Sequence, residues 1–563
     1  MKKNKQAGDK EVKAPTGRHA SALLTACLLI STAAAAAPLP CARLVGLAIP
    51  ASAMDLPTSG AVVDAADMVA ASGAGVAKVP EHCLVAGSIA PVDKTAPNIK
   101  FKIALPTVWN GKALMFGGGG FNGSVPNVLG NVPAAPTDQP SPIARGYATF
   151  GSDSGHQANA LASRDHAFGM NDEALRNFGG DALKKTHDAA VFIIKARYGA
   201  TKKIQRSYFA GGSTGGREAL AVITHWPQDW DGAISWYPAW NDLSALLQGQ
   251  RINRALAQPG AYPNTPKRKL LMDAALAACD GLDGVVDGLI AKQDQCNAVF
   301  DPAVLRCVGG ADTGDTCLSD AQITALKVMN TDAHFNFALA SGETQYPGSN
   351  VWGADLGITS IKTPIQPIVT FLALGTAQPA RPMPTAGPYI GTFMDQWIKY
   401  AVTRDPSYDT LSLDPENPGP WAGRISALSA QLDTPVNLDA FAAKGGKLLL
   451  AHGLSDVLVS TRATAQYYQR LQARMKPGEL DKFVRYYEVA GYGHALSSTF
   501  NAAWDSLTAL ENWVEKAKAP TQQIVTDTIG VPGRTRPLCD YPQWPKYKGA
   551  GDVNLAASFT CSN

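Results

Sequence analysis

The pentapeptide Gly211-Gly212-Ser213-Thr214-Gly215 has the G-x-S-x-G pattern of a nucleophilic serine. It follows a predicted strand over residues 207–210 and precedes a predicted helix over 217–224, so Ser213 falls on a strand-to-helix turn. Such a turn is tight and needs small residues beside the serine. A glycine-rich turn with a bystander serine is the alternative, and the strand–turn–helix context favours the nucleophile.

A serine nucleophile on such a turn needs an acid and a histidine later in the chain. Asp456 follows the apolar run 448–450, and His494 follows a predicted strand over 484–489. His494 is predicted to act as general base on Ser213, with Asp456 holding its tautomer. A structural turn histidine is the alternative for His494. Two other histidines are predicted to be structural: His156 and His452.

A negatively charged oxygen that forms during acyl transfer needs two hydrogen-bond donors. The turn directs the backbone N–H of Thr214 toward that oxygen. The second donor is predicted in the run Phe116-Gly117-Gly118-Gly119-Gly120, because glycine lets backbone N–H groups approach a substrate closely. Gly118 is the predicted donor, and a flexible loop without a role is the alternative.

Alternating strand and helix patterns surround these residues and predict an α/β sheet. Strands are predicted over 99–105, 112–116, 148–152, 206–210, 447–451 and 484–489, and helices over 181–198, 217–224 and 502–518. Residues 239–435 are instead rich in Pro, Gly, Asp and aromatics. The sequence therefore predicts an α/β-hydrolase core, residues 38–238 and 436–563, interrupted by a large inserted lid domain, residues 239–435.

The first 37 residues are predicted to be a cleaved signal peptide, with six basic residues followed by the apolar run 20–37. A lipoprotein box at 24–27 and an uncleaved anchor are the alternatives, and Ala51-Ser52-Ala53 is a second possible cleavage motif. We expect a secreted or periplasmic protein.

Removal of the leader takes away a net charge of +4 from a chain of net charge +3 and leaves −1. Beyond the leader there is no basic patch for nucleic acid and no segment long and apolar enough to span a membrane. The expected partner is therefore a small-molecule substrate, and the sequence leaves the oligomeric state open.

Eight cysteines lie beyond the leader, and an even number in an exported chain predicts disulfides. Cleavage at residues 51–53 would remove Cys41 and leave seven, which favours cleavage near Ala37. The remaining cysteines cluster locally, in a way typical of short loop staples, but their connectivity stays open.

The loop Asp280-Gly281-Leu282-Asp283-Gly284-Val285-Val286-Asp287-Gly288 places three carboxylates close together. Hard oxygen ligands at this density suit Ca²⁺. The predicted ligands are Asp280, Asp283 and Asp287 with the carbonyls of Val285 and Leu289. The spacing differs from that of an EF-hand, and a solvent loop rich in Asx turns is the alternative. We expect a structural ion, because the loop is far in sequence from the serine.

These segments together resemble the tannase/feruloyl esterase family, which includes the hydrolase of mono(2-hydroxyethyl) terephthalate. The likeness is carried by Glu81-His82-Cys83, Trp109-Asn110-Gly111, Asn122-Gly123-Ser124, the serine motif through Arg217, the Cys279–Cys296 aspartate loop, Cys307–Cys317, His452-Gly453-x-x-Asp456 and Arg534-Thr535-Arg536-Pro537-Leu538-Cys539. The resemblance implies a lid that carries calcium and closes over an aromatic ester. It also implies the disulfides Cys41–Cys83, Cys279–Cys296, Cys307–Cys317 and Cys539–Cys561.

This sequence departs from the family at the two positions where relatives place cysteines that tie serine to histidine. Here they are Gly212 and Ala495. The triad residues remain, so ester chemistry is expected to survive, with a more mobile site and a lower melting temperature than in a bridged relative.

The predicted activity is hydrolysis of esters of hydroxycinnamic or gallic acids through an acyl-enzyme. A terephthalate monoester is the alternative within the same chemistry, but it calls for a lid arginine, and Arg381 is the only one in 375–400. Phe393 and Trp397 are candidates for lining the acyl pocket, with core packing as the alternative. A binding protein on a decayed hydrolase scaffold and a peptidase are the competing classes.

Overall fold

A ten-stranded mixed sheet forms the centre of the computed structural model, which describes residues 11, 13–14 and 37–563. The strand order is β1-β2-β3-β4-β6-β5-β7-β8-β11-β12, antiparallel from β1 to β6 and parallel from there to β12. The strands are β1 (Ala48–Ile49), β2 (Ala61–Val69), β3 (His82–Ile89), β4 (Ile99–Pro106), β5 (Lys112–Phe116), β6 (Ala148–Ser152), β7 (Arg206–Gly212), β8 (Gly232–Trp236), β11 (Lys447–Gly453) and β12 (Val484–Val489).

Both faces of the parallel part of the sheet are covered, which explains why most residues of its strands are apolar instead of alternating with polar ones. Along β5, Ala113 and Met115 pack into one core while Leu114 and Phe116 pack into the other. The first core is completed by α2 (Ala182–Tyr198), α3 (Thr214–His225) and α12 (Thr461–Arg474), and the second by α13 (Ser506–Lys516). This arrangement confirms the predicted α/β class.

The predicted strands of the core agree with the observed ones to within two residues at each end. The predicted helix over 502–518 is wrong at its start. Residues Ala502–Ala503 form the short strand β13, and the helix begins only at Ser506, because the Asp505 side chain caps it by accepting a hydrogen bond from Thr508 N. The antiparallel strands β1 to β3 were not predicted.

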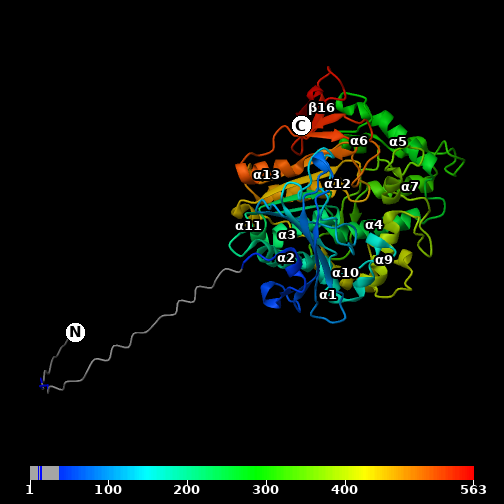
Figure 1. Cartoon of the computed structure of the whole chain (residues 1–563). Helices are drawn as coiled ribbons and strands as arrows, with labels where there is room; N and C mark the ends of the chain where they lie inside the picture. The colour runs from blue at the N-terminus through cyan, green and yellow to red at the C-terminus, as the bar shows by residue number, and fades with distance from the viewer. Residues whose placement is uncertain (1–10, 12, 15–36) are drawn as a thin grey trace, which may run out of the picture.

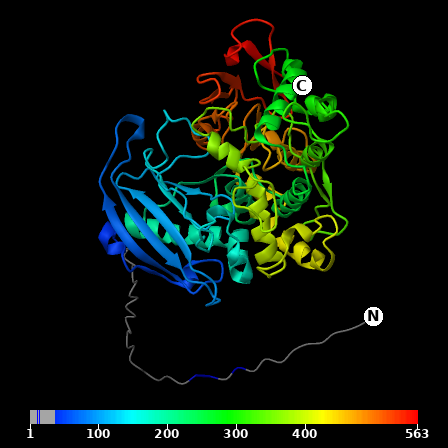
Figure 2. The same ribbon diagram turned by 90° about the vertical axis from the view of Figure 1, so that its right-hand side faces the viewer.

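Residues 239–435, the inserted segment, fold into helices, loops and one short antiparallel pair of strands, β9 (Ala333–His334) and β10 (Gln345–Tyr346), between β8 and β11. The helices are α4 (Asp242–Leu256), α5 (Thr265–Cys279), α6 (Gln293–Val299), α7 (Asp320–Asn330), α8 (Gln366–Leu372), α9 (Tyr389–Trp397) and α10 (Ala422–Leu432). In Figure 1 most of them lie on one side of the molecule, opposite α2, α3 and α13. Figure 2 shows the blue N-terminal strands at the far end from the green and yellow helices of this segment. Part of the segment has a hydrophobic cluster of its own, built from residues 252–374.

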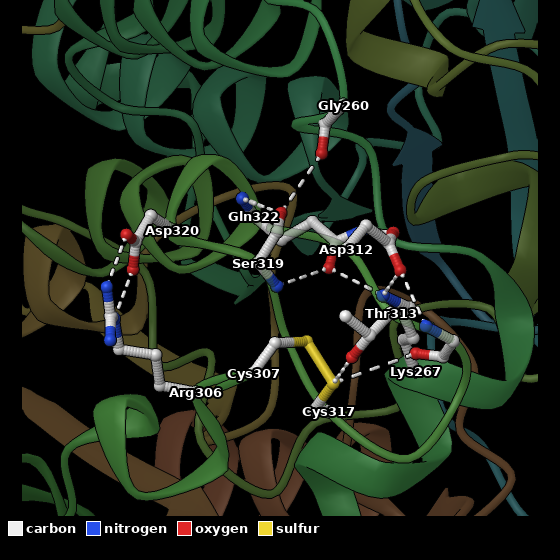
Figure 3. The surroundings of a disulfide bond; sticks show 11 residues. Gly260, Lys267, Arg306, Cys307, Asp312, Thr313, Cys317, Ser319, Asp320 and Gln322 are labelled. Atoms are coloured by element: carbon white, nitrogen blue, oxygen red, sulfur yellow. Dashed lines mark hydrogen bonds and ion pairs between the residues drawn. A yellow bond between two sulfur atoms is a disulfide. The ribbon is translucent and has the colours of Figure 1, made fainter. Parts of the chain in front are cut away.

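Four disulfides join Cys41–Cys83, Cys279–Cys296, Cys307–Cys317 and Cys539–Cys561, which confirms the pairing that the family resemblance implied. Figure 3 shows the surroundings of Cys307–Cys317, just before α7. The ammonium group of Lys267, a buried residue, pairs there with Asp312 at 2.8 Å and donates to Gln322 at 3.0 Å. Ser319 and Gln322 form a capping box at the start of α7, so the bridge, the ion pair and the cap hold one short loop onto this helix.

The predicted signal peptide, residues 1–37, lies almost wholly outside the described residues. Within the described part of the chain, no helix has both the length and the apolar composition needed to cross a bilayer.

Candidate active site

Ser213 lies at the sharp turn between β7 and α3, with φ 61° and ψ −126°. This backbone conformation is unfavourable for an L-residue and is held by close packing on both sides of the turn. A Cβ on Gly211 would lie 2.3 Å from Gly215 O, and a Cβ on Gly215 would lie 2.6 Å from Gly118 O. Both glycines of the motif are therefore required by contact distance.

The structure brings the three residues predicted from the sequence into one hydrogen-bonded chain. His494 Nε2 lies 3.0 Å from Ser213 Oγ, and His494 Nδ1 lies 2.8 Å from Asp456 Oδ2. Ser213 follows β7, Asp456 follows β11 and His494 follows β12, so three parallel strands present them at the same edge of the sheet. The arrangement can pass a proton from the serine hydroxyl to the imidazole and stabilise the imidazolium that results.

Asp456 is fully buried and accepts hydrogen bonds from two histidines and from the loop that carries it. His452 Nε2 lies 3.1 Å from Asp456 Oδ2, while the backbone N–H groups of Leu458 and Val459 donate to Oδ1 at 2.9 Å. Burial by itself would raise the pKa of this carboxyl, but His494 and His452 together hold it below its usual range. Asp456 is therefore an ionised and firmly oriented partner for His494, and His452 has the structural position predicted for it.

The structure corrects the predicted role of Gly118. Its backbone N–H donates to Glu218 Oε2 at 2.9 Å, and Asn122 Nδ2 donates to the other oxygen at 2.5 Å. The Gly118 donor is therefore already used. Gly119 follows it in the same run and lines the active-site cavity, as does Thr214, and neither backbone N–H is hydrogen-bonded to another described residue. The sequence indicated a glycine run that lies at the cavity but could not show which of its N–H groups is free.

Tyr237 occupies the space between the serine loop and the histidine loop. A Cβ on Gly212 would lie 2.5 to 2.6 Å from the Tyr237 ring and hydroxyl, and that ring lies 4.9 Å from the His494 ring, centroid to centroid. Gly212 and Ala495 are the positions where the family usually has its bridging cysteines. An aromatic ring therefore packs here against both loops, which the sequence did not indicate.

We expect Gly212→Ala to lower the free energy of unfolding by about 1–3 kcal/mol, because the new methyl overpacks against the Tyr237 ring. Thermal unfolding of the variant measures this loss. Gly423→Ala is the matched control, since a Cβ there meets nothing within 4 Å and should leave stability unchanged or slightly raised. Tyr237→Ala in the Gly212→Ala background should recover part of the loss, and a double-mutant cycle without coupling would contradict the packing described here.

A cavity of about 440 Å³ opens at Ser213 and His494 and is bounded on its other side by the inserted segment. Its walls are mainly apolar, with Leu246, Phe371, Leu372, Ile390, Phe393 and Leu458. Of the two aromatics predicted to line it, Phe393 does, and its ring stacks on Phe121 at 3.5 Å. Trp397 is instead fully buried in the neighbouring core.

Few charged side chains lie at this cavity, and the guanidinium of Arg164 lies 4.9 Å from the ring centre of Phe371, one of the lining residues. Asp242, at the start of α4, contributes a carboxylate to the cavity wall. No lysine or arginine is among the described residues that line the cavity. Arg381 lies elsewhere, pairing with Asp409 at 2.9 Å with its side chain 62% exposed. Nothing in the spacing of residues around Asp242 indicated that it would reach the cavity, because no local pattern distinguishes it from the first residue of an ordinary helix.

The aspartate loop contacts the C-terminal part of the chain. Arg534 donates to Asp287 O at 3.0 Å, and Arg536 pairs closely with the Asp287 carboxylate. Burial raises the pKa of Asp283 to about 7, with further contributions from Asp287 and Asp280. In the described chain neither Asp280 nor Asp283 has a basic ion-pair partner, and both carboxylates accept hydrogen bonds from backbone N–H groups of the same loop.

A second cluster of potential metal ligands consists of His187, Asp188 and Asp229, whose ligand atoms lie within 4.8 Å of one another. The three carboxylates of the aspartate loop do not meet this distance in the described structure. Here Lys184 is already in place, with its ammonium 2.7 Å from Asp188 and 3.0 Å from Asp229. The lysine supplies the positive charge that a metal would bring, so this group is an internal ion-pair network.

Comparison with known proteins agrees with this geometry. Residues 83–562 match the family model of tannase and feruloyl esterase. An uncharacterized esterase of Agrobacterium fabrum is 37% identical over 535 residues, with 93% of each chain covered. The mono(2-hydroxyethyl) terephthalate hydrolase of Piscinibacter sakaiensis is 32% identical, covering 90% of this chain and 89% of that one. The crystal structure of feruloyl esterase B from Aspergillus oryzae superposes with a TM-score of 0.72 at 22% identity, covering 90% of this chain and 98% of that one, which shows a shared α/β-hydrolase fold. The chain therefore belongs to the tannase and feruloyl esterase family and is a carboxylic ester hydrolase.

Proposed function

We propose that this esterase hydrolyses esters of hydroxycinnamic or gallic acids through a covalent acyl-enzyme on Ser213. The observation that carries the proposal is the hydrogen-bonded chain Ser213–His494–Asp456 opening into an apolar cavity. A flat aromatic acyl group matches such walls, because apolar and aromatic surfaces bury aromatic rings favourably.

In the proposed reaction Ser213 Oγ attacks the ester carbonyl while His494 Nε2 accepts its proton. The backbone N–H groups of Thr214 and Gly119 stabilise the negative oxygen of the tetrahedral intermediate. His494 then gives the proton to the departing alcohol, and a water molecule activated by the same imidazole releases the acid. A complex with a boronate or phosphonate inhibitor whose oxygen bonded to Gly118 rather than Gly119 would overturn the assignment of the oxyanion hole.

The cavity favours neutral or phenolic acyl groups over a terephthalate monoester, whose free carboxylate needs a positive partner. The described lining supplies none, and Arg381 is engaged with Asp409. The relationship to the terephthalate monoester enzyme keeps that substrate as the second candidate.

A panel of methyl ferulate, methyl gallate, chlorogenate and the terephthalate monoester tests the proposal, with kcat/KM as the measurement. We expect turnover of at least one phenolic ester to exceed that of the monoester. Hydrolysis of the monoester alone, or of peptides in place of esters, would overturn it. The intact triad is also expected to give burst release from a p-nitrophenyl ester, which a pure binding protein would not show.

We also propose that the aspartate loop binds a structural Ca²⁺. Asp280, Asp283 and Asp287 would hold it with the carbonyls of Val285 and Leu289, and the ion would offset the repulsion among the three carboxylates. Because Arg534 and Arg536 join this loop to the C-terminal strands, an ion there would fasten the inserted segment to the rest of the molecule.

Chelation is therefore expected to lower the melting temperature by a few degrees, because a ligand at 100 times its Kd stabilises a fold by about 2.7 kcal/mol. The measurement is thermal unfolding with EGTA, followed by addition of Ca²⁺ or of Mg²⁺ alone. We expect Ca²⁺ to restore the transition and Asp283→Asn to remove its effect. If neither EGTA nor added Ca²⁺ changed the unfolding curve, the loop would hold no calcium.

Export is the third part of the proposal. Four disulfides are typical of proteins that fold in an oxidising compartment, and the basic and apolar residues at the N-terminus fit a signal peptide. N-terminal sequencing of protein recovered outside the cytoplasm should begin near residue 38, and a chain that still began at Met1 would contradict this.

A further inference from the structure

A buried carboxylate lines the active-site cavity and takes no part in the catalytic chain. Asp242 is the first residue of α4 and is 6% exposed, with that exposure facing a cavity whose other walls are mainly apolar. Among the described residues no donor forms a hydrogen bond with its carboxylate. Burying an ionised group without a partner is costly, so such a group calls for an explanation.

The guanidinium of Arg217 lowers the pKa of Asp242 but does not pair with it. Arg217 is buried in α3, but its guanidinium donates to the backbone oxygens of Gly179, Phe178 and Leu432 at 3.0 to 3.3 Å. It forms no ion pair with Asp242 among the described residues. Asp433, also buried, lies nearby: burial, with a further contribution from Asp242, raises its pKa to about 7, and its Oδ1 accepts a hydrogen bond from Leu243 N at 2.8 Å.

The Asp242 carboxylate can therefore accept a hydrogen bond from whatever enters the cavity. Burial raises its pKa to about 6, so it is still mostly ionised at neutral pH. An ionised acceptor in an apolar pocket binds a hydroxyl donor strongly and repels an anion. A phenol has a flat apolar ring that can pack against the cavity walls. It also has an acidic O–H group that can donate a hydrogen bond to the carboxylate.

We propose that Asp242 is a specificity-determining residue that accepts a hydrogen bond from a ring hydroxyl of the aromatic acyl group. The inference rests on the proposed function and narrows it to phenolic acids. It also predicts discrimination against a terephthalate monoester, because the free carboxylate of that substrate would share an apolar cavity with Asp242.

The test compares methyl cinnamate with methyl 3-hydroxycinnamate and methyl 4-hydroxycinnamate in the full-length enzyme, since these esters differ only in the ring hydroxyl. We expect the wild-type kcat/KM for at least one hydroxy ester to exceed that for cinnamate by roughly 10-fold or more, as a hydrogen bond to a charged group allows. Asp242→Leu should abolish the preference and Asp242→Asn should reduce it, while hydrolysis of the terephthalate monoester should rise in both variants. The ratio of two substrates on one variant does not depend on how much of that variant is folded.

Asp433→Asn is the matched control, because Asp433 is a buried acid beside Asp242 that is not part of the cavity lining. Its hydroxyl preference should equal that of the wild type. A preference that survives in Asp242→Leu, or one absent from the wild type, overturns the role of Asp242. Wild-type enzyme that hydrolyses none of the three cinnamates would instead count against the proposed function, so the two failures are distinguishable.

Discussion

Ser213→Ala should lose at least about 10⁴-fold in kcat while keeping its melting temperature. The substitution removes only the hydroxyl group. Replacing a triad serine typically lowers kcat by about 10⁶-fold, and the residual rate comes from the oxyanion hole and from substrate binding. The partner nitrogen, His494 Nε2, lies 3.0 Å from the missing oxygen and makes its other ring contact with Asp456, so the site should stay assembled.

Hydrolysis of a p-nitrophenyl ester under pre-steady-state conditions measures this effect, and the burst of p-nitrophenol should disappear together with turnover. Ser59→Ala is a suitable control, because Ser59 Oγ donates only to Pro91 O at an exposed site remote in sequence from the triad. If Ser213→Ala kept more than about a hundredth of the wild-type rate, another nucleophile would have to be sought.

Asp456→Asn is expected to reduce kcat by about 10⁴-fold, the loss seen when a triad aspartate becomes an amide. Asparagine keeps the shape and can still accept from Leu458 N and Val459 N. It removes the negative charge that faces His494 Nδ1 and His452 Nε2, so the imidazole loses both its preferred tautomer and the partner of its charged form.

Steady-state rates on methyl ferulate, with circular dichroism to confirm folding, measure the effect of Asp456→Asn. Asp64→Asn is the control, since Asp64 pairs with Lys100 at 3.5 Å on the surface and should contribute little. A folded Asp456→Asn variant with more than a tenth of the wild-type activity would mean that another acid orients His494.

Local chemistry explains why much of the catalytic site could be predicted from the sequence. A nucleophile turn needs glycines at fixed offsets, and the acid and histidine follow recognisable apolar strands, so Ser213, Asp456 and His494 could each be found from their own neighbourhood. The strands of the parallel sheet are buried on both faces and therefore appear as short apolar runs. The early strands β2 and β3 were missed, because one is half exposed and both contain small or polar residues that weaken the pattern.

The tertiary structure decided which groups are free at the active-site cavity. The choice between Gly118 and Gly119 depends on Glu218, a hundred residues further along the chain, whose carboxylate takes one of the two N–H groups. Tyr237 and Asp242 approach the site from the turn after β8 and from α4, and no local pattern distinguishes them from residues of an ordinary helix start.

The sequence by itself determined the type of chemistry, the identity of the three triad residues, the α/β class and the number of cysteines available for bridges, because each follows from residue type, local spacing or a count. The tertiary structure alone decided which glycine has a free N–H group, which aromatic lines the cavity and which is core, and that a carboxylate lines the active-site cavity. These depend on contacts between segments far apart in the chain, and such contacts form only when the inserted segment and the sheet pack together.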